Sequence, residues 1–414
     1  MDSRPEIAWA AAETAARQSY GKLVAWLAAR TRDVAAAEDA LADAFAAALE
    51  RWPRTGVPEK PEAWLLAVAR RRRVDAVRRR LTSEAGREHL KLIAEEMEAR
   101  MTDEDLPDER LRLMFACAHP AIEPGIRSPL ILQTVLGFDA ATIASAFLVS
   151  PATMGQRLVR AKNRIRETGI PFRVPDRTEL GERLDAVLEA IYAAFAEGWS
   201  DPAGTETRRR NLASEGIWLG RLMASLMPEE PEALGLLSLM LFAEARRAAR
   251  RDAAGDYVPL AEQDHTLWDG ALVDEAESLL RRAATMGVIG RYQLEAAVQS
   301  AHAARRLTGR TDWVAVRELY DALLSIAGSP VVAINRAVAI AEAEGAVAGL
   351  AALYVLGDDK RLDEYQPYWA ARAGLLARLG QAPQACEAYD RAIGLERDPA
   401  VRRFLQGKRA VLRN

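Results

Sequence analysis

A chain of 414 residues is too long for one ordinary hydrophobic core, so two to four domains are expected. Half of the residues are hydrophobic, 28% are charged and the net charge is −3, which is typical of a globular protein and excludes one that coats nucleic acid uniformly. There is no signal-peptide core and no apolar run long enough to span a membrane, and the two cysteines, Cys117 and Cys386, are far apart. We therefore expect a cytoplasmic protein without a disulfide framework.

Residues 7–81 form the first predicted domain, which is helical. Within it, residues 37–51 predict an amphipathic helix whose apolar side chains recur every four residues and whose start exposes two acids. The apolar side chains are Leu41, Phe45 and Leu49, and the exposed acids are Glu38 and Asp39. Such an acidic helix is common and does not identify a function by itself.

A strongly basic helix follows a proline-rich break at residues 52–61. It runs from Trp64 to Arg80 with seven arginines, and residues 51–80 together carry a net charge of +7. Such a helix requires an anionic partner or solvent screening, and a phosphate backbone is the commonest partner. Trp52 and Trp64 flank the break, where they either stack on unpaired bases or pack in the core.

A second helical domain is predicted at residues 109–172, after an acidic linker at residues 82–108. Residues 139–166 predict two short helices joined by a tight turn, the first capped by Asp139 and the second beginning at Ser150 and Pro151. The second helix has an inward apolar stripe, formed by Met154, Leu158, Ala161 and Ile165.

The outer face of that second helix is basic, as in a helix-turn-helix that enters a DNA major groove. The alternative is a solvated face on an ordinary helical bundle. Side chains near its start are expected to reach base edges, and those further along to contact phosphates. The first group is Thr153, Gln156 and Arg157, and the second is Arg160, Lys162, Arg164 and Arg166.

Residues 173–414 predict a helical extension with internal repeats, clearest at residues 291–400. Gly309, Gly345 and Gly380 follow one another at 36 and 35 residues, the repeat length of TPR helix pairs. A generic helical bundle remains the alternative. The polar residues 250–268 indicate either a capped surface loop or a regulatory contact, and no chemistry is assigned to them.

An enzymatic function has little support in the sequence. Cys117 and His119 have no further ligands at metal-binding spacing, and there is no glycine-rich phosphate loop or nucleophile elbow. We expect no catalysis, no metal and no cofactor.

The order of acidic helix, proline-rich break, basic helix, acidic linker and helix-turn-helix resembles an extracytoplasmic-function sigma factor of the sigma-70 family. The run AEDALADAF, residues 37–45, is similar to the polymerase-binding helix of that family's region 2. The run AWLLAVARRRRVDAVRRR, residues 63–80, is similar to the segment that melts and reads the minus-ten element. Residues 143–161 are similar to the region 4 helix-turn-helix that reads the minus-thirty-five element. Residues 184–199 and 250–268 resemble the subgroup with a TPR-like C-terminal extension.

The resemblance implies an all-α protein that directs core RNA polymerase to promoter DNA. It also implies that the extension modulates this activity through a protein partner or another part of the chain. The residues implied for core polymerase are Glu38, Asp39, Leu41, Asp43 and Phe45. Those implied for minus-ten DNA are Trp64, Arg70, Arg71, Arg72, Arg73, Arg78 and Arg79. Those implied for minus-thirty-five DNA are Ser150, Thr153, Gln156, Arg157, Arg160, Lys162 and Arg164.

Two other functions remain open. A one-component helix-turn-helix regulator with a TPR sensor, which does not bind polymerase, leaves the arginine-rich helix unexplained. A TPR adaptor leaves the first 170 residues or so unexplained. Binding to core RNA polymerase discriminates among the three.

Overall fold

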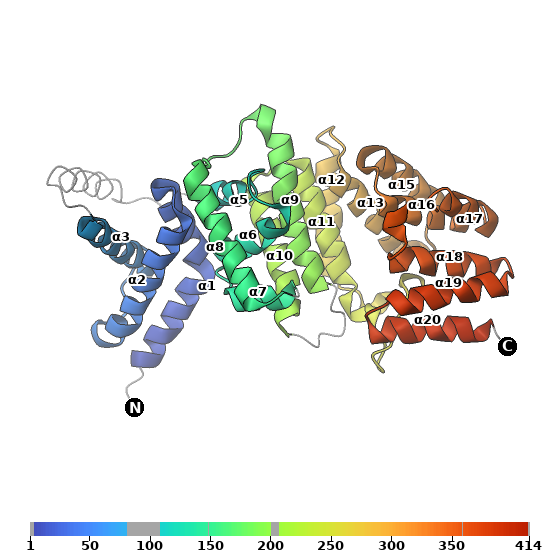
Figure 1. The fold of residues 1–414 in the computed structure, drawn as a ribbon, viewed down its shortest axis with the longest axis horizontal. Coiled ribbons are helices and arrows are strands. Elements are labelled where there is room, and N and C mark those ends of the chain that lie inside the picture. The colour runs from blue at the N-terminus through green and yellow to red at the C-terminus, as the bar shows by residue number, and fades with distance from the viewer. Residues whose placement is uncertain (1–3, 81–107, 148, 200–206, 358, 413–414) are drawn as a thin grey trace. The chain divides into compact units, whose positions relative to one another are not determined.

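The computed structural model describes residues 4–80, 108–147, 149–199, 207–357 and 359–412 (Figure 1). In these ranges every regular element is a helix, apart from one isolated antiparallel bridge between Arg251 and Tyr257. The prediction of an all-α fold is confirmed. The described residues divide into two compact units, unit 1 from Met1–Gly198 and Asn211–Glu215, and unit 2 from Trp199–Arg210 and Gly216–Asn414. No described helix is both long and apolar enough to cross a membrane.

Unit 1 combines the helices of both predicted promoter-binding domains. Helix α1 packs against α2 and α3 and also against α5 and α6, so segments on either side of residues 81–107 share one core. The division of the chain at the predicted residue boundaries remains a prediction. The helices are α1 (Arg4–Thr31), α2 (Val34–Thr55), α3 (Pro61–Arg80), α5 (Arg110–Cys117), α6 (Pro124–Leu136), α7 (Ala140–Ala146), α8 (Pro151–Thr168) and α9 (Arg177–Trp199).

Helices α1 and α6 approach each other closely at Gly21. A Cβ atom at this position would overlap the carbonyl oxygen of Val135, so only glycine allows the contact. The neighbouring Tyr20 ring packs against Gly137, which ends α6 with φ = 74° in the left-handed conformation that glycine favours. The two sequence blocks of unit 1 are therefore joined by backbone packing that tolerates no side chain.

The first helix of the predicted extension also belongs to unit 1. Arg183 of α9 is buried, and its guanidinium donates a hydrogen bond of 2.6 Å to the carbonyl oxygen of Phe115 on α5. Burial lowers the pKa of this guanidinium.

Unit 2 is a series of helices in which sequence neighbours pack on one another. Helix α11 contacts α12 and α13, α15 contacts α16, α16 contacts α17, and α18 contacts α19. The helices are α10 (Thr207–Leu226), which both units share, α11 (Pro231–Ala245), α12 (Gly270–Ala284), α13 (Arg291–Ala303), α14 (Arg305–Thr308), α15 (Trp313–Ala327), α16 (Pro330–Ala343), α17 (Ala346–Tyr354), α18 (Gln366–Arg378), α19 (Ala382–Leu395) and α20 (Pro399–Val411). Short 3₁₀ turns lie at η1 (Arg247–Arg250), η2 (Leu260–Glu262), η3 (His265–Leu267) and η4 (Lys360–Leu362).

The repeated glycines mark turns between these helices, as predicted. Gly309 ends α14, Gly345 precedes α17 and Gly380 lies between α18 and α19, each with a positive φ, of 72°, 106° and 72°. In the last hairpin, Ala385 and Tyr389 of α19 belong to a buried cluster with residues of α16, α17, α18 and α20. The sequence repeat therefore corresponds to a repeat of helix pairs, and its assignment as TPR-like remains a prediction.

Candidate functional site

Helix α2 carries the candidate polymerase-binding residues. It begins at the N-cap Asp33, whose carboxylate accepts a hydrogen bond of 3.0 Å from the backbone N–H of Ala36. Asp39 and Asp43 are exposed and Phe45 is half-buried. Leu41, which we expected to contact polymerase, has no exposed surface and is part of the core of unit 1. Its packing in this core holds α2 in place.

The expected exposure of Glu38 is wrong. Its carboxylate Oε2 lies 2.6 Å from the Lys162 ammonium of α8, and the two side chains are only 12% and 10% exposed. Burial raises the pKa of Glu38, an effect that the Lys162 charge opposes. The pattern within α2 did not indicate this burial, because the covering residue is 124 positions away.

The Lys162 ammonium, which we expected to contact a phosphate group, is paired with the Glu38 carboxylate in this structure, and its phosphate contact remains a prediction. Further along α8, a guanidinium nitrogen of Arg166 lies 3.7 Å from the carboxylate of Asp33. The C-terminal half of α8 thus has one side turned toward α2. Arg157, Arg160 and Arg164, by contrast, are exposed.

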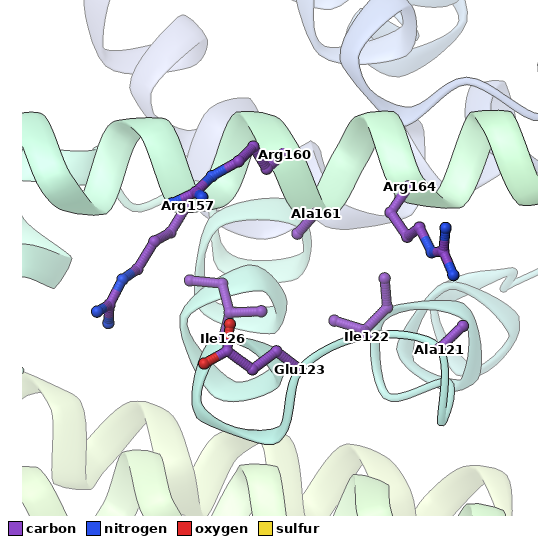
Figure 2. Close-up of a pocket in the computed structure, with 8 residues that line it drawn as sticks. All are labelled: Ala121, Ile122, Glu123, Ile126, Arg157, Arg160, Ala161 and Arg164. Atoms are coloured by element: carbon purple, nitrogen blue, oxygen red, sulfur yellow. The ribbon is translucent and has the colours of Figure 1, made fainter.

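The exposed arginines of α8 line a groove of about 390 Å³ (Figure 2). Its opposite wall is formed by the turn before α6 and the start of that helix, with Ile122, Glu123 and Ile126. Three guanidinium groups against one carboxylate give the groove a net positive charge. The described lining therefore combines apolar contact area with attraction for an anion.

The local structure of α7 and α8 follows the sequence prediction. The Asp139 carboxylate accepts a hydrogen bond of 2.8 Å from the N–H of Thr142, and Ser150 Oγ accepts one of 3.1 Å from the N–H of Thr153. The predicted inward stripe of α8 is buried and α7 packs against α8. Gln156 is exposed near the start of α8, whereas Thr153 is half-buried and its hydroxyl lies 2.8 Å from that of Ser150.

Helix α3 exposes Arg71 and Arg72, and Arg70 is half-buried. Of the two tryptophans beside the proline-rich break, Trp52 is buried, 1% exposed, and packs edge-on against the half-buried Trp64 at 5.5 Å between ring centroids. Trp52 is therefore a core residue, and Trp64 retains some accessible surface. The predictions for the side chains of Arg73, Arg78 and Arg79 lie outside what the structure describes.

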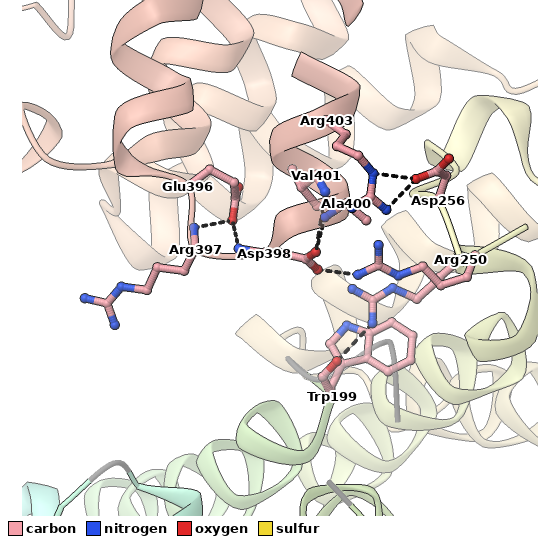
Figure 3. A network of polar contacts seen from close by, with 10 residues as sticks. Trp199, Arg250, Asp256, Glu396, Arg397, Asp398, Ala400, Val401 and Arg403 are labelled. Atoms are coloured by element: carbon pink, nitrogen blue, oxygen red, sulfur yellow. Dashed lines mark hydrogen bonds and ion pairs between the residues drawn. The ribbon is translucent and has the colours of Figure 1, made fainter. Parts of the chain in front are cut away.

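The polar residues 250–268 of unit 2 form a loop that is held by hydrogen bonds and ion pairs (Figure 3). Arg250 donates a hydrogen bond of 2.9 Å to the carbonyl oxygen of Trp199 and lies over its ring, 4.1 Å from the centroid. Arg251 pairs with Asp398, and the Arg403 guanidinium lies 2.6 Å from the Asp256 carboxylate. Burial and the neighbouring arginines lower the pKa of Arg250 to about 10. These contacts hold the loop against Trp199 and the start of α20, and a regulatory role for the loop remains a prediction.

Two family models match parts of the chain. Residues 16–82, which include α2 and α3, match Sigma-70 region 2. Residues 183–284 match a family of unknown function, DUF6596. The chain is also 40% identical over 383 residues to the protein of Rhizobium meliloti (strain 1021) named Uncharacterized protein R00370, which covers 91% of this chain and 89% of that protein. No solved structure matches the chain.

Proposed function

Because the chain belongs to the same family as the Rhizobium meliloti protein and contains a sigma-70 region 2 domain, we propose that it is a sigma factor of the extracytoplasmic-function type. The region 2 match supports a role in binding core RNA polymerase and in transcription initiation. The main structural support is that α2 exposes Asp39 and Asp43 while α3 exposes Arg71 and Arg72. The acidic surface of α2 suits a basic protein surface, and the basic surface of α3 suits DNA.

Helices α7 and α8 act in this proposal as the helix-turn-helix that reads the minus-thirty-five element. Gln156 and Arg157 are exposed near the start of α8, where they reach base edges, and Arg160 and Arg164 contact phosphates. The hydroxyls of Ser150 and Thr153 serve mainly the N-cap. Helix α3 contacts the minus-ten element through its exposed arginines, with Trp64 at the edge of that surface.

The helical extension in unit 2 modulates this activity. Stacked helix pairs present a continuous surface that suits another protein or another part of the same chain. In this proposal the hairpins from α15 to α20 supply that surface, and the repeat spacing supports TPR-like packing.

The decisive experiment measures binding of the purified full chain to core RNA polymerase, together with run-off transcription from a promoter. We expect the double variant Asp39→Lys, Asp43→Lys to bind core at least ten times more weakly than the wild type, because the two acids are exposed on the face of α2 that this proposal assigns to polymerase. The matched control is Glu364→Lys, Glu387→Lys, which reverses two exposed acids of unit 2.

Wild-type affinity of a folded Asp39, Asp43 variant would show that α2 is not the polymerase-binding helix. A full chain that binds promoter DNA but neither binds nor redirects core polymerase would instead favour the one-component regulator.

A further inference from the structure

Six arginines of unit 2 lie where η1, the loop of residues 250–268 and α14 meet. Four of them are in or directly beside η1, and the other two begin α14. We call these residues the arginine cluster, and they are Arg246, Arg247, Arg250, Arg251, Arg305 and Arg306. The loop connects the two groups, because Arg250 starts it and the Arg305 guanidinium donates a hydrogen bond of 3.4 Å to the carbonyl oxygen of Leu260 within it.

The two groups of arginines act on shared side chains. The pKa of His302 on α13 is lowered to about 4 by burial and by the charges of Arg246 and Arg305, one from each group. The ring of Trp199 is approached by three guanidiniums of the first group. Their distances from the ring centroid are 5.6, 5.0 and 4.1 Å for Arg246, Arg247 and Arg250. The positive charges of the cluster are therefore concentrated in one part of unit 2.

The arginine cluster has too few carboxylates for its positive charge. Two of its ion pairs are Arg247 with Glu244 and Arg251 with Asp398. The Arg250 guanidinium instead donates to a backbone carbonyl oxygen, as that of Arg305 does. Within the described ranges, the residues of the cluster that pair with no carboxylate include Arg250, Arg305 and Arg306.

The acids of the loop do not supply the missing negative charge. They are Asp252, Asp256, Glu262 and Asp264, and all four are exposed. The first and the last accept hydrogen bonds from backbone N–H groups of their own turns, and the other two lie 2.6 and 3.9 Å from basic side chains of α20. Exposed acids around half-buried arginines disfavour a DNA duplex, which would meet the acids first.

Several guanidinium nitrogens of the cluster are buried and have no hydrogen-bond partner among the described residues. They are Nη2 of Arg247, Nε and Nη1 of Arg251, and Nη1 of Arg306. The Arg251 side chain is only 10% exposed, so water does not replace the missing acceptors. Buried donors without acceptors destabilise a fold, and neighbouring like charges add to this effect. Such a cluster is expected where the charges bind a ligand.

We propose that the arginine cluster of unit 2 is a binding site for a small anion that carries a phosphate group. The planar fork of a guanidinium matches phosphate oxygens with two parallel hydrogen bonds, and a compact anion fits among half-buried side chains where a duplex does not. A free inorganic ion and a phosphorylated metabolite both present this chemistry. The inference goes beyond the proposed function, because it assigns the extension a ligand of its own.

The test titrates the full chain by isothermal calorimetry with inorganic phosphate, pyrophosphate and ribose 5-phosphate. Citrate is the control ligand, since it has a comparable charge on carboxylates. We expect one site per chain, and at least one of the phosphate compounds should bind ten times more tightly than citrate. Tightest binding of the sugar phosphate identifies a metabolite as the ligand class, and tightest binding of phosphate or pyrophosphate identifies an inorganic ion.

Two variants remove one guanidinium from each group and keep an apolar stem. Arg250→Met and Arg306→Met should each weaken the tightest phosphate ligand at least tenfold, because a half-buried charge is little screened by solvent. Arg310→Met is the matched control, since Arg310 is exposed and follows α14, and its affinity should equal that of the wild type.

A measurement without ligand separates a binding role from a structural one. Arg306→Met removes a buried donor that has no partner among the described residues, so the midpoint of its thermal unfolding should equal or exceed that of the wild type. A lower midpoint would assign Arg306 to the fold and overturn the proposal.

The proposal is also overturned if no phosphate compound binds more tightly than citrate, if either folded cluster variant keeps wild-type affinity, or if Arg310→Met weakens binding as much as the other two. The titrations use the free chain. Failure to bind core polymerase would therefore overturn the proposed function and leave the result for the arginine cluster unchanged.

Discussion

The two units both contain ion pairs between residues more than a hundred positions apart, but the pairs differ in their surroundings. In unit 1, the Glu38 and Lys162 side chains are 12% and 10% exposed and join two helices that belong to different predicted domains. In unit 2, the Asp256 and Arg403 side chains are 51% and 56% exposed and join a loop to the last helix, beside a second pair, Arg251 and Asp398, whose side chains are 10% and 24% exposed. An exposed pair such as Asp256–Arg403 contributes little to the free energy of unfolding because water and salt screen it.

The two units also differ in how far apart in the sequence their packed helices are. Unit 1 brings two sequence blocks together across residues 81–107, so its arrangement depends on packing between segments that are far apart in the chain. Most helices of unit 2 pack on their neighbours in the sequence, and stability is then spread over many similar contacts.

The largest expected change in stability comes from a substitution that disrupts the packing of unit 1. Gly21→Ala forces a methyl group against the backbone of α6 and should lower the free energy of unfolding of unit 1 by about 3 kcal/mol. Gly155→Ala on α8 is the control, since no atom lies within 4 Å of a Cβ there, and it should stabilise the helix by about 0.5–1 kcal/mol. Urea denaturation gives the free energies and hydrogen exchange assigns them to a unit. Equal effects of the two substitutions would contradict the close contact.

A pH-dependent effect is expected in unit 2, at His302. Burial, with the charges of Arg246 and Arg305, lowers its pKa from 6.5 to about 4. The unfolded chain therefore binds this proton at a higher pH than the folded chain, so the stabilisation is complete above about pH 6.5 and is lost as the pH falls toward 4. Between pH 7 and pH 5 the free energy of unfolding should fall by about 2 kcal/mol because of this residue.

The measurement for His302 compares the wild type with His302→Gln in urea denaturation at several pH values. The difference in slope between the two proteins isolates this residue from the other titrating groups of unit 2. Parallel curves across this range would mean that His302 titrates in the folded protein as it does in the unfolded chain.

The smallest effect concerns the loop contacts of unit 2. Asp398 caps α20 by accepting a hydrogen bond of 2.8 Å from the N–H of Ala400, and it also pairs with Arg251, whose side chain is only 10% exposed. Asp398→Ala should therefore lower the free energy of unfolding of unit 2 by about 1–2 kcal/mol. Arg403→Gln, which removes the exposed pair with Asp256, should cost less than about 1 kcal/mol. If the second substitution costs more than the first in thermal denaturation, exposure does not determine the strength of these pairs.

The sequence by itself determined the local structure of this protein. Ser150 and Pro151 start α8, and Gly380 lies in a turn between helices, because caps and left-handed turns depend on residues a few positions apart. The buried stripe of α8 was predicted for the same reason, since helical periodicity places one face inward. The order of charged helices also sufficed to indicate region 2, which the family match supports.

Only the tertiary structure decided which neighbour covers each face. Periodicity predicted that Glu38 points away from the apolar stripe of α2, but not that Lys162 would cover it, and it did not distinguish an exposed Leu41 from a buried one. Trp52 and Trp64 have similar positions beside the same break, yet the first is in the core and the second is half-buried. These outcomes depend on contacts between residues far apart in the chain, and a pattern of period 3.6 contains no information about the segment that packs against it.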